Sequence, residues 1–167
     1  MSEECFDVVN PRDEVIGRAS RREVHARGLL HRAVQAMVYD ARGRVYLQRR
    51  SLTKDTSPGR WASSCSGHVD AGEDYDTAVV RELGEEIGLR LAAAPRRWFF
   101  IAACPETGWE FVWVYRLVHD GPFVLHPEEI AEGAWFEPAV LTTRIAEEPG
   151  IFATPFRLVW EKISAGA

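Results

Sequence analysis

Cysteine is scarce in this chain, and no long hydrophobic run or excess of positive charge stands out. The three cysteines, Cys5, Cys65 and Cys104, are sparse and odd in number, which excludes a disulfide framework. That scarcity predicts a reducing, cytoplasmic location. The acidic N-terminus Met1–Cys5 is followed by no apolar run, so no signal peptide is expected. No stretch approaches the roughly 18 apolar residues of a membrane span, so no membrane association is expected.

The balance of charge narrows the class of partner. A net charge of −5 argues against broad, non-specific binding to nucleic acid, and we expect no stable nucleic-acid partner. A nucleotide ligand stays compatible with this charge, because binding depends on the local field. The chain has no repeat and no break in composition, and its 167 residues predict one domain over residues 1–167. Nothing in the sequence indicates an oligomeric state.

Hydrophobic patterns predict more strands than helices. The clearest helix covers Asp74–Ile87, because Val79, Leu83 and Ile87 recur every four residues and Gly88 follows as a C-terminal glycine. With further helices near the end of the chain, this order indicates an α/β (α+β) fold with a mixed sheet covered on both faces. The other elements predicted are strands at Phe6–Val9, His31–Tyr39, Val45–Gln48, Trp61–Cys65, Trp98–Ala103, Glu110–Val118 and Ala134–Phe136, and helices at Ser20–His25, Pro138–Glu147 and Pro155–Ile163.

Three glutamates share one face of the predicted helix. Glu82, Glu85 and Glu86 are spaced i, i+3 and i+4. Like charges at this spacing cost about 0.2–0.5 kcal/mol per pair, and negative charge near a helix C-terminus also opposes the helix dipole. Gly84 adds a helix-propensity cost of roughly 0.8–1 kcal/mol. A cluster of hard oxygen ligands suits Mg²⁺ or Mn²⁺, so the pattern predicts a divalent-metal site.

A solvated helix face is the alternative interpretation of these glutamates. Arg81 lies four residues from Glu85, and Glu86 lies four residues from Arg90, so ion pairs would account for two of the three. Glu82 has no oppositely charged residue four positions away on either side. The pattern by itself leaves both interpretations open.

The segment from Gly67 to Leu89 resembles the Nudix box. That motif is Gly, five residues, Glu, seven residues, Arg-Glu, an aliphatic residue, any residue, Glu-Glu, any residue, Gly and an aliphatic residue. Chance agreement at every fixed position is improbable, so the motif is specific. The fixed positions are filled by Gly67, Glu73, Arg81, Glu82, Leu83, Glu85, Glu86, Gly88 and Leu89.

The resemblance implies a fold and a set of roles. The fold is the Nudix α/β/α sandwich, with the box as a loop–helix–loop. Glu73 is expected to pair with Arg81 and orient the helix, and Gly88 to end it. Mg²⁺, with Mn²⁺ as a possible substitute, is the implied cofactor. Its implied ligands are Glu82, Glu85, Glu86 and the carbonyl of Gly67.

Other stretches are similar to one branch of the family. Leu30–Ala33, Leu47–Asp55 and Pro58–Trp61 resemble the branch that contains isopentenyl-diphosphate isomerase and its hydrolase-like relatives. In those isomerases a catalytic cysteine immediately precedes the Gly-His of the box. Ser66 occupies that place here, and Cys65 is one residue early, which in an extended chain points its side chain to the opposite face. This departure and the complete box favour hydrolysis.

The same branch suggests a second set of metal ligands. His25, His31 and His68 resemble isomerase ligands, although the gap between the first two is one residue short. Glu110 resembles an acidic ligand of that site. For each histidine a surface or hydrogen-bonded position is the simpler interpretation, and for Glu110 an outward-facing position on a strand.

Four further charged residues are candidates for the site. Many Nudix enzymes place a supporting glutamate in a late loop, and Glu129 is favoured here over Glu128. Arg49, Arg50 and Lys54 would bind substrate phosphates, the alternative being solvation at the surface.

Three functions follow from these resemblances. The first is a metal-dependent pyrophosphohydrolase that cleaves a diphosphate linkage in a nucleoside di- or triphosphate or a related nucleotide. Glu82 or Glu129 would deprotonate the attacking water, and Glu86 would be essential as a metal ligand. The second is an isomerase similar to isopentenyl-diphosphate isomerase, and the third is a non-catalytic nucleotide-binding module. Trp61 or Trp109 would be able to stack on a base, although the core or its rim is the commoner place for tryptophan.

Overall fold

A seven-stranded mixed sheet forms the centre of the protein in a computed structural model that describes residues 3–167. The strands are β3 (His31–Tyr39), β4 (Val45–Arg50), β5 (Trp61–Ala62), β6 (Cys65–His68), β7 (Arg96–Ile101), β8 (Glu110–Val118) and β9 (Ile130–Phe136). Their order is β5-β4-β3-β8-β7, with β6 paired to β3 and β9 paired to β4. β3 and β8 run parallel, and the other pairs are antiparallel.

The central strand β3 separates two hydrophobic cores. Ala33 and Met37 belong to one core, whereas Val34 and Val38 belong to the other. Successive side chains of a strand point to opposite faces, so a strand buried on both sides reads as a nearly continuous apolar run. The sheet is therefore covered on both faces.

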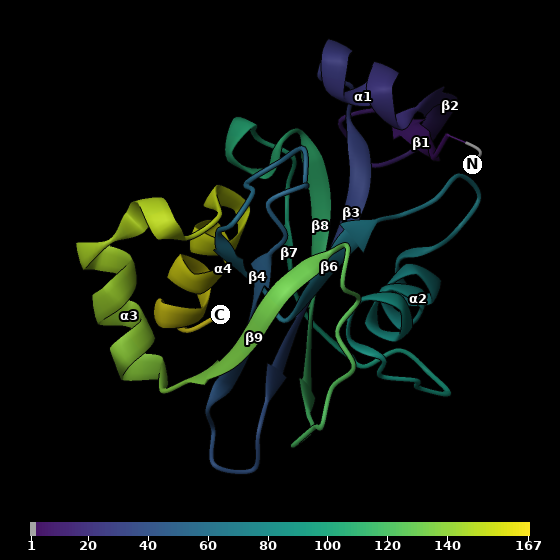
Figure 1. Cartoon of the computed structure of the whole chain (residues 1–167). Coiled ribbons are helices and arrows are strands. Elements are labelled where there is room, and N and C mark those ends of the chain that lie inside the picture. Colours follow the sequence, from purple (N-terminus) through teal and green to yellow (C-terminus); the bar gives the residue numbers. More distant parts are fainter. Residues whose placement is uncertain (1–2) are drawn as a thin grey trace.

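Helices cover the two faces as the sequence predicts. α2 (Tyr75–Ile87) packs on one face, and α3 (Pro138–Glu147) and α4 (Thr154–Ser164) pack on the other (Figure 1). Two short 3-10 turns, η1 (Pro105–Thr107) and η2 (Pro149–Ile151), precede β8 and α4. The predicted mixed sheet in an α/β/α sandwich is confirmed.

Both ends of α2 are fixed by the residues that the sequence indicates. The Asp74 side chain accepts a hydrogen bond from the backbone N–H of Thr77 at 2.7 Å, which caps the helix start. Gly88 ends the helix with φ +69°, a conformation that is costly for residues with a Cβ. Between them, Val79, Leu83 and Ile87 are fully buried. The adjoining side of α2, which carries Glu82 and Glu86, is thus held in a defined orientation toward β6.

The N-terminal segment forms a small unit beside the main sheet. β1 (Cys5–Val9) pairs antiparallel with β2 (Val15–Ser20), and α1 (Arg21–Arg27) follows (Figure 1). Ser20 caps α1 by accepting a hydrogen bond from the backbone N–H of Glu23. The backbone of Val9 donates to Leu30, which ties the unit to the start of β3. This attachment brings α1 close to the start of β3 and the end of β6.

Several predicted strands differ from the structure only in their bounds, such as Trp98–Ala103, which corresponds to β7 (Arg96–Ile101), and one is divided. The segment Trp61–Cys65 does not form one extended strand; it divides into β5 and the start of β6, which pair with different neighbours. Ser63 and Ser64 lie at the break and are buried. The Ser64 hydroxyl donates to the Tyr46 carbonyl and accepts from the Val38 backbone N–H, so it bridges two strands. A buried hydroxyl thereby supplies hydrogen bonds where the ladder is interrupted.

Within residues 3–167, no helix is both long and apolar enough to cross a membrane. Part of the acidic N-terminus considered in the sequence, Met1 and Ser2, lies outside the described residues.

Truncating Leu83 should destabilise the protein without altering the surface of α2 that carries the glutamates. Leu83 is fully buried, so Leu83→Ala is expected to lower the free energy of unfolding by about 2–5 kcal/mol. Urea denaturation measures this loss. Val140→Ala, at a position 53% exposed, is the control and should change stability by no more than about 0.5 kcal/mol. Equal effects of the two substitutions would contradict the described packing of α2.

Candidate active site and metal centre

A cleft of about 740 Å³ lies where α2, β3, β6, the turn before β8 and the start of α4 meet. Two groups of side chains with different chemistry line it. One contains the glutamates of α2 beside Gly67, and the other contains three histidines and Glu110. The two groups meet along β6, where Gly67 and His68 are neighbours in sequence.

The first group depends on a close approach between Glu82 and Gly67. A Cβ atom at Gly67 would lie 2.0 Å from Cδ of Glu82, so this position leaves no space for a side chain. Arg81 donates a hydrogen bond to Glu82 at 2.7 Å. The carboxylate of Glu82 therefore lies directly over the β6 backbone, where the sequence resemblance places the Gly67 carbonyl and Glu82 as joint ligands.

Glu86 is buried beneath this contact, with 6% of its surface exposed. It accepts hydrogen bonds from the side chain of Gln48 at 2.8 Å and from the backbone N–H of Ser66 at 3.0 Å. The predicted ion pair of Glu86 with Arg90 is wrong, because burial turns Glu86 toward β4 and β6 while Arg90 is exposed. Glu86 is thus held by neutral donors, and either a proton or a bound cation would balance its charge.

Arg81 connects the remaining acidic residues of the box. It donates two hydrogen bonds to Glu73, at 3.0 and 2.9 Å, and one to the His68 carbonyl at 3.0 Å. Its contact with Glu85, at 3.3 Å, is the ion pair expected from the helical spacing. The predicted pairing of Glu73 with Arg81 is confirmed. Glu82 has no oppositely charged residue four positions away, but its neighbour Arg81 turns back to bind it.

Burial and mutual repulsion make the carboxyls of Glu82 and Glu86 basic. Burial, followed by the charge of Glu86, raises the pKa of Glu82 to about 8 despite its contact with Arg81. Burial also raises the pKa of Glu86, although Ser66 and Gln48 donate hydrogen bonds to it. Two buried carboxyls that repel each other favour either a shared proton or a bound cation.

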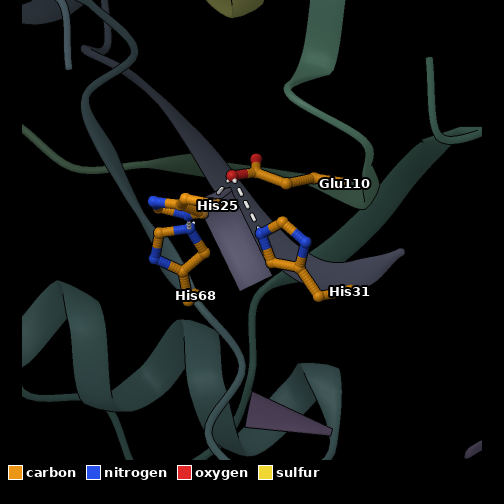
Figure 2. A group of neighbouring side chains, drawn as sticks. All are labelled: His25, His31, His68 and Glu110. Atoms are coloured by element: carbon orange, nitrogen blue, oxygen red, sulfur yellow. Dashed lines mark hydrogen bonds and ion pairs between the residues drawn. The ribbon is translucent and has the colours of Figure 1, made fainter. Parts of the chain in front are cut away.

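The second group converges from four separate elements. His25 comes from α1, His31 from the start of β3, His68 from β6 and Glu110 from the start of β8 (Figure 2). Their potential ligand atoms all lie within 4.8 Å of one another. Nε2 of His68 is 3.3 Å from Nε2 of His25 and 3.0 Å from Oε1 of Glu110. The structure thus groups histidines for which the sequence favoured separate surface or hydrogen-bonded positions.

The orientation of His31 suits a metal ligand. Its Nδ1 lies 2.8 Å from the Leu29 carbonyl, which can only accept, so the proton of the neutral ring is on Nδ1. The buried Nε2 then presents a lone pair and has no hydrogen-bond partner within residues 3–167. It faces Oε1 of Glu110, a second acceptor, at 3.5 Å. Two acceptors that face each other in a buried site are stabilised by a cation between them.

Glu110 is the anionic member of this group. Burial raises the pKa of a carboxyl, but the neighbouring imidazoles of His31 and His68, in their protonated forms, outweigh this effect and bring the pKa of Glu110 to about 2. Burial, together with the charges of His68 and His31, lowers the pKa of His25. Three imidazoles and one carboxylate form a donor set that suits divalent transition metals such as Zn²⁺, Mn²⁺ or Co²⁺.

Comparison with known proteins identifies the family of this chain. A family model for the NUDIX domain matches residues 29–154. The chain belongs to the Nudix family. The match begins after α1, so the part of the chain that supplies His25 lies outside it.

The relatives include two kinds of Nudix protein. The uncharacterised Nudix hydrolase YfcD of Escherichia coli is 35% identical over 149 residues, which covers 87% of this chain and 81% of YfcD. The isopentenyl-diphosphate Delta-isomerase of Burkholderia multivorans is 34% identical over 163 residues, covering 96% of this chain and 93% of the isomerase. The crystal structure of DR0079 from Deinococcus radiodurans is similar with a TM-score of 0.78 at 33% identity, covering 87% and 90% of the two chains.

The other predicted Nudix site residues divide between cleft and surface. Arg50, Lys54 and Glu129 line the cleft, and Lys54 pairs with Glu129. Arg49 lies on the other face of β4 and pairs with Glu132 at 3.0 Å. It is not among the residues that line the cleft, because neighbours on a strand point to opposite sides. A phosphate-binding role for Arg49 is therefore not supported.

The side chains of Cys65 and Ser66 point to opposite faces of β6, as expected for neighbours on a strand. Ser66 lines the cleft, whereas Cys65 is 1% exposed and packs in the core with α2. Burial and the charge of Glu86 raise the pKa of the Cys65 thiol well above its usual value. A buried thiol with a raised pKa is a poor acid–base group near neutral pH.

The sequence does not point to two residues that support the site. Gln48 ends the apolar run of β4 and reads as a strand residue, yet it binds Glu86. Phe6 stacks on His68 with ring centroids 4.5 Å apart. The one available signal is that a glutamine in an otherwise buried strand needs a polar partner.

The close contact at Gly67 can be tested with a single methyl group. Gly67→Ala should displace the Glu82 carboxylate and weaken Mn²⁺ binding by about tenfold or more, measured by electron paramagnetic resonance titration. Gly84→Ala is the matched control, because a Cβ there meets no atom within 4 Å. It should leave Mn²⁺ affinity unchanged and raise stability by about 0.5–1 kcal/mol. Unchanged Mn²⁺ affinity in Gly67→Ala would refute a metal site at this contact.

The histidine group can be tested with Co²⁺, whose visible spectrum reports nitrogen ligands. His25→Ala should weaken binding of spectroscopically visible Co²⁺ by about tenfold or more. His119→Ala, which changes a histidine outside the group, should bind as the unchanged protein does. If both variants bind Co²⁺ equally well, His25 is not a ligand.

Proposed function

We propose that this Nudix protein is a metal-dependent pyrophosphohydrolase that cleaves a diphosphate linkage in a nucleoside di- or triphosphate or a related nucleotide. The observation that supports this proposal is a pair of neighbouring carboxyls: Glu82 lies against Gly67 with Arg81 as its donor, and the buried Glu86 is held by the neutral donors Gln48 and Ser66. Glu85 stands beside them with its side chain 60% exposed, where it is accessible to a ligand. Mg²⁺ is the proposed cofactor, with Mn²⁺ as a substitute.

The residues of the cleft supply what hydrolysis of a diphosphate requires. A divalent cation held by the glutamates and the Gly67 carbonyl would neutralise phosphate charge and acidify the attacking water. Arg50 and Lys54 line the same cleft, which supports the proposal that their cationic groups bind the phosphates of the substrate. Catalysis then depends mainly on position and electrostatics, as in phosphoryl transfer generally.

Glu82 and Glu129 remain the two candidates for the residue that accepts a proton from water. Glu82 is supported by its burial and by a pKa of about 8, which makes its carboxylate a stronger base than an exposed one. Glu129 is paired with Lys54 and must give up that contact in order to act. Comparison of Glu129→Gln with Lys54→Met separates the two proposed functions of this pair, which are acceptance of the proton by Glu129 and binding of phosphate by Lys54.

Isomerisation of an allylic or homoallylic diphosphate is a second candidate, because the histidine group and the isomerase relatives favour it. Ser66 in place of a cleft-facing cysteine argues against it, as does the buried position of Cys65. The complete set of box glutamates also favours hydrolysis. We therefore place isomerisation second.

Two other features stay predictions of the sequence. A single domain over residues 1–167 agrees with the way the N-terminal unit supplies His25 to the cleft. A cytoplasmic location follows only from the scarcity of cysteine.

The hydrolase proposal predicts a specific loss of activity. Glu86→Gln keeps the size of the side chain but removes the charge, so release of phosphate or pyrophosphate from nucleotides with Mg²⁺ should fall by about 100-fold or more. The substrate is first identified from nucleoside di- and triphosphates, nucleotide sugars and dinucleoside polyphosphates. Glu147→Gln, at an exposed position on α3, should retain full activity. Full activity in a folded Glu86→Gln variant would refute the mechanism.

Incubation with isopentenyl diphosphate separates the two candidate reactions. The hydrolase proposal predicts no allylic isomer with Mg²⁺, Mn²⁺ or Zn²⁺ present, as measured by nuclear magnetic resonance. Formation of the allylic isomer would replace the hydrolase proposal with the isomerase. Tight binding of a nucleotide without turnover of any compound would indicate a binding module instead.

A further inference from the structure

Trp109 occupies an unusual position at one end of the cleft. Trp109 lines the cleft and is 42% exposed, whereas Phe6 and Phe156, which also line the cleft, are buried. Trp61, the other tryptophan considered from the sequence, packs edge-on against Phe136 with ring centroids 5.1 Å apart. It does not line the cleft. The structure therefore distinguishes Trp109 from a core tryptophan.

The backbone at Trp109 is held in a conformation that tryptophan rarely adopts. Its φ is +65°, directly after Gly108 with φ +72°. A left-handed conformation is costly for a bulky residue and persists only where the surroundings enforce it. The Trp109 backbone N–H donates to the Cys104 carbonyl at 2.9 Å, and its carbonyl accepts from His31. The turn between η1 and β8 thus fixes the direction of the indole.

A buried threonine makes this turn rigid. Thr107 is 2% exposed, and its hydroxyl contacts the backbones of both Cys104 and Glu110. The same turn therefore positions Trp109 and Glu110, a candidate metal ligand. Side chains that bind a ligand are typically held by rigid support of this kind.

The end of α1 supports one edge of the indole. A Cβ at Gly28 would lie 3.3 Å from Cδ1 of Trp109, so this edge of the ring rests on the C-terminal end of α1. Trp109 nevertheless keeps 42% of its surface exposed in the lining of the cleft. The ring is therefore supported at one edge and accessible from the cleft.

The order of residues along β3 places Trp109 beyond the two ligand groups. Gly67 pairs with Val34, His68 with Ala33, and Glu110 with His31. Three residues along β3 separate Val34, which pairs with Gly67, from His31, which pairs with Glu110. At 3.3 Å per residue this is a distance of about 10 Å. A diphosphate bound at the glutamates and directed along this line would bring its organic group to Trp109.

We propose that Trp109 is the residue that recognises the organic group of the substrate, and that this group is a planar nucleobase stacked on the indole. The proposal rests on the proposed hydrolase only for the position of the diphosphate. A flat, half-exposed ring offers most contact to another flat ring, whereas a short alkyl chain gains most when it is enclosed on several sides.

Three probes that share a diphosphate test this assignment. ADP carries a planar base, isopentenyl diphosphate carries an alkenyl group, and inorganic pyrophosphate carries neither. Affinities are measured by calorimetry with Ca²⁺ as the divalent ion. Trp109→Leu should weaken ADP binding by roughly five- to 100-fold, as expected for the loss of one stacked base, and leave pyrophosphate binding unchanged. Trp109→Phe should retain part of the ADP affinity, and Phe100→Leu, at an exposed aromatic outside the cleft, should retain all of it.

Several results would overturn the assignment. Unchanged ADP affinity in Trp109→Leu would do so, as would an equal loss for pyrophosphate or for isopentenyl diphosphate. Failure of the unchanged protein to bind ADP more tightly than pyrophosphate would also do so, while leaving hydrolysis of another diphosphate intact. Conversely, a selective loss of ADP binding in Trp109→Leu, without any hydrolysis of nucleotides, would support Trp109 and refute the proposed reaction.

Discussion

The arrangement of the cleft depends on the contact between Glu82 and the backbone of Gly67. This contact requires a glycine on β6, a helix held at a fixed distance and Arg81 to position the carboxylate. Burying a second carboxylate, Glu86, one helical turn later would be strongly unfavourable without a cation. The fold therefore accepts a local cost in stability at the place where a ligand with positive charge would remove it.

The cleft combines two donor sets with different preferences. Carboxylates and a carbonyl suit hard cations such as Mg²⁺, whereas three imidazoles with one carboxylate suit transition metals. The two sets share β6, where Gly67 belongs to one and His68 to the other. Any substrate phosphate bound at one set therefore lies close to the other, which gives a physical reason why one Nudix scaffold accommodates both hydrolase-like and isomerase relatives.

Side-chain direction on β6 gives the strongest argument between those two reactions. Because neighbours on a strand point to opposite faces, a shift of one residue puts Ser66 in the cleft and Cys65 in the core. The glutamates of the box, which are the proposed metal ligands, therefore line the cleft, whereas the thiol does not. The identity of the group that meets the substrate is thus decided by strand alternation.

The sequence by itself determined the local elements and the motif. It predicted β3 and β8 to the residue, the two ends of α2 and the pairing of Glu73 with Arg81, because periodicity, capping and spacing act over a few residues. The tertiary structure alone decided the burial of Glu86, the surface position of Arg49 and the gathering of His25, His31, His68 and Glu110. Those residues come from elements that are distant in the chain, and their distances depend on strand pairing and on the docking of α1. No local pattern encodes such long-range contacts, and the fold sets them only when the sheet and its helices are assembled.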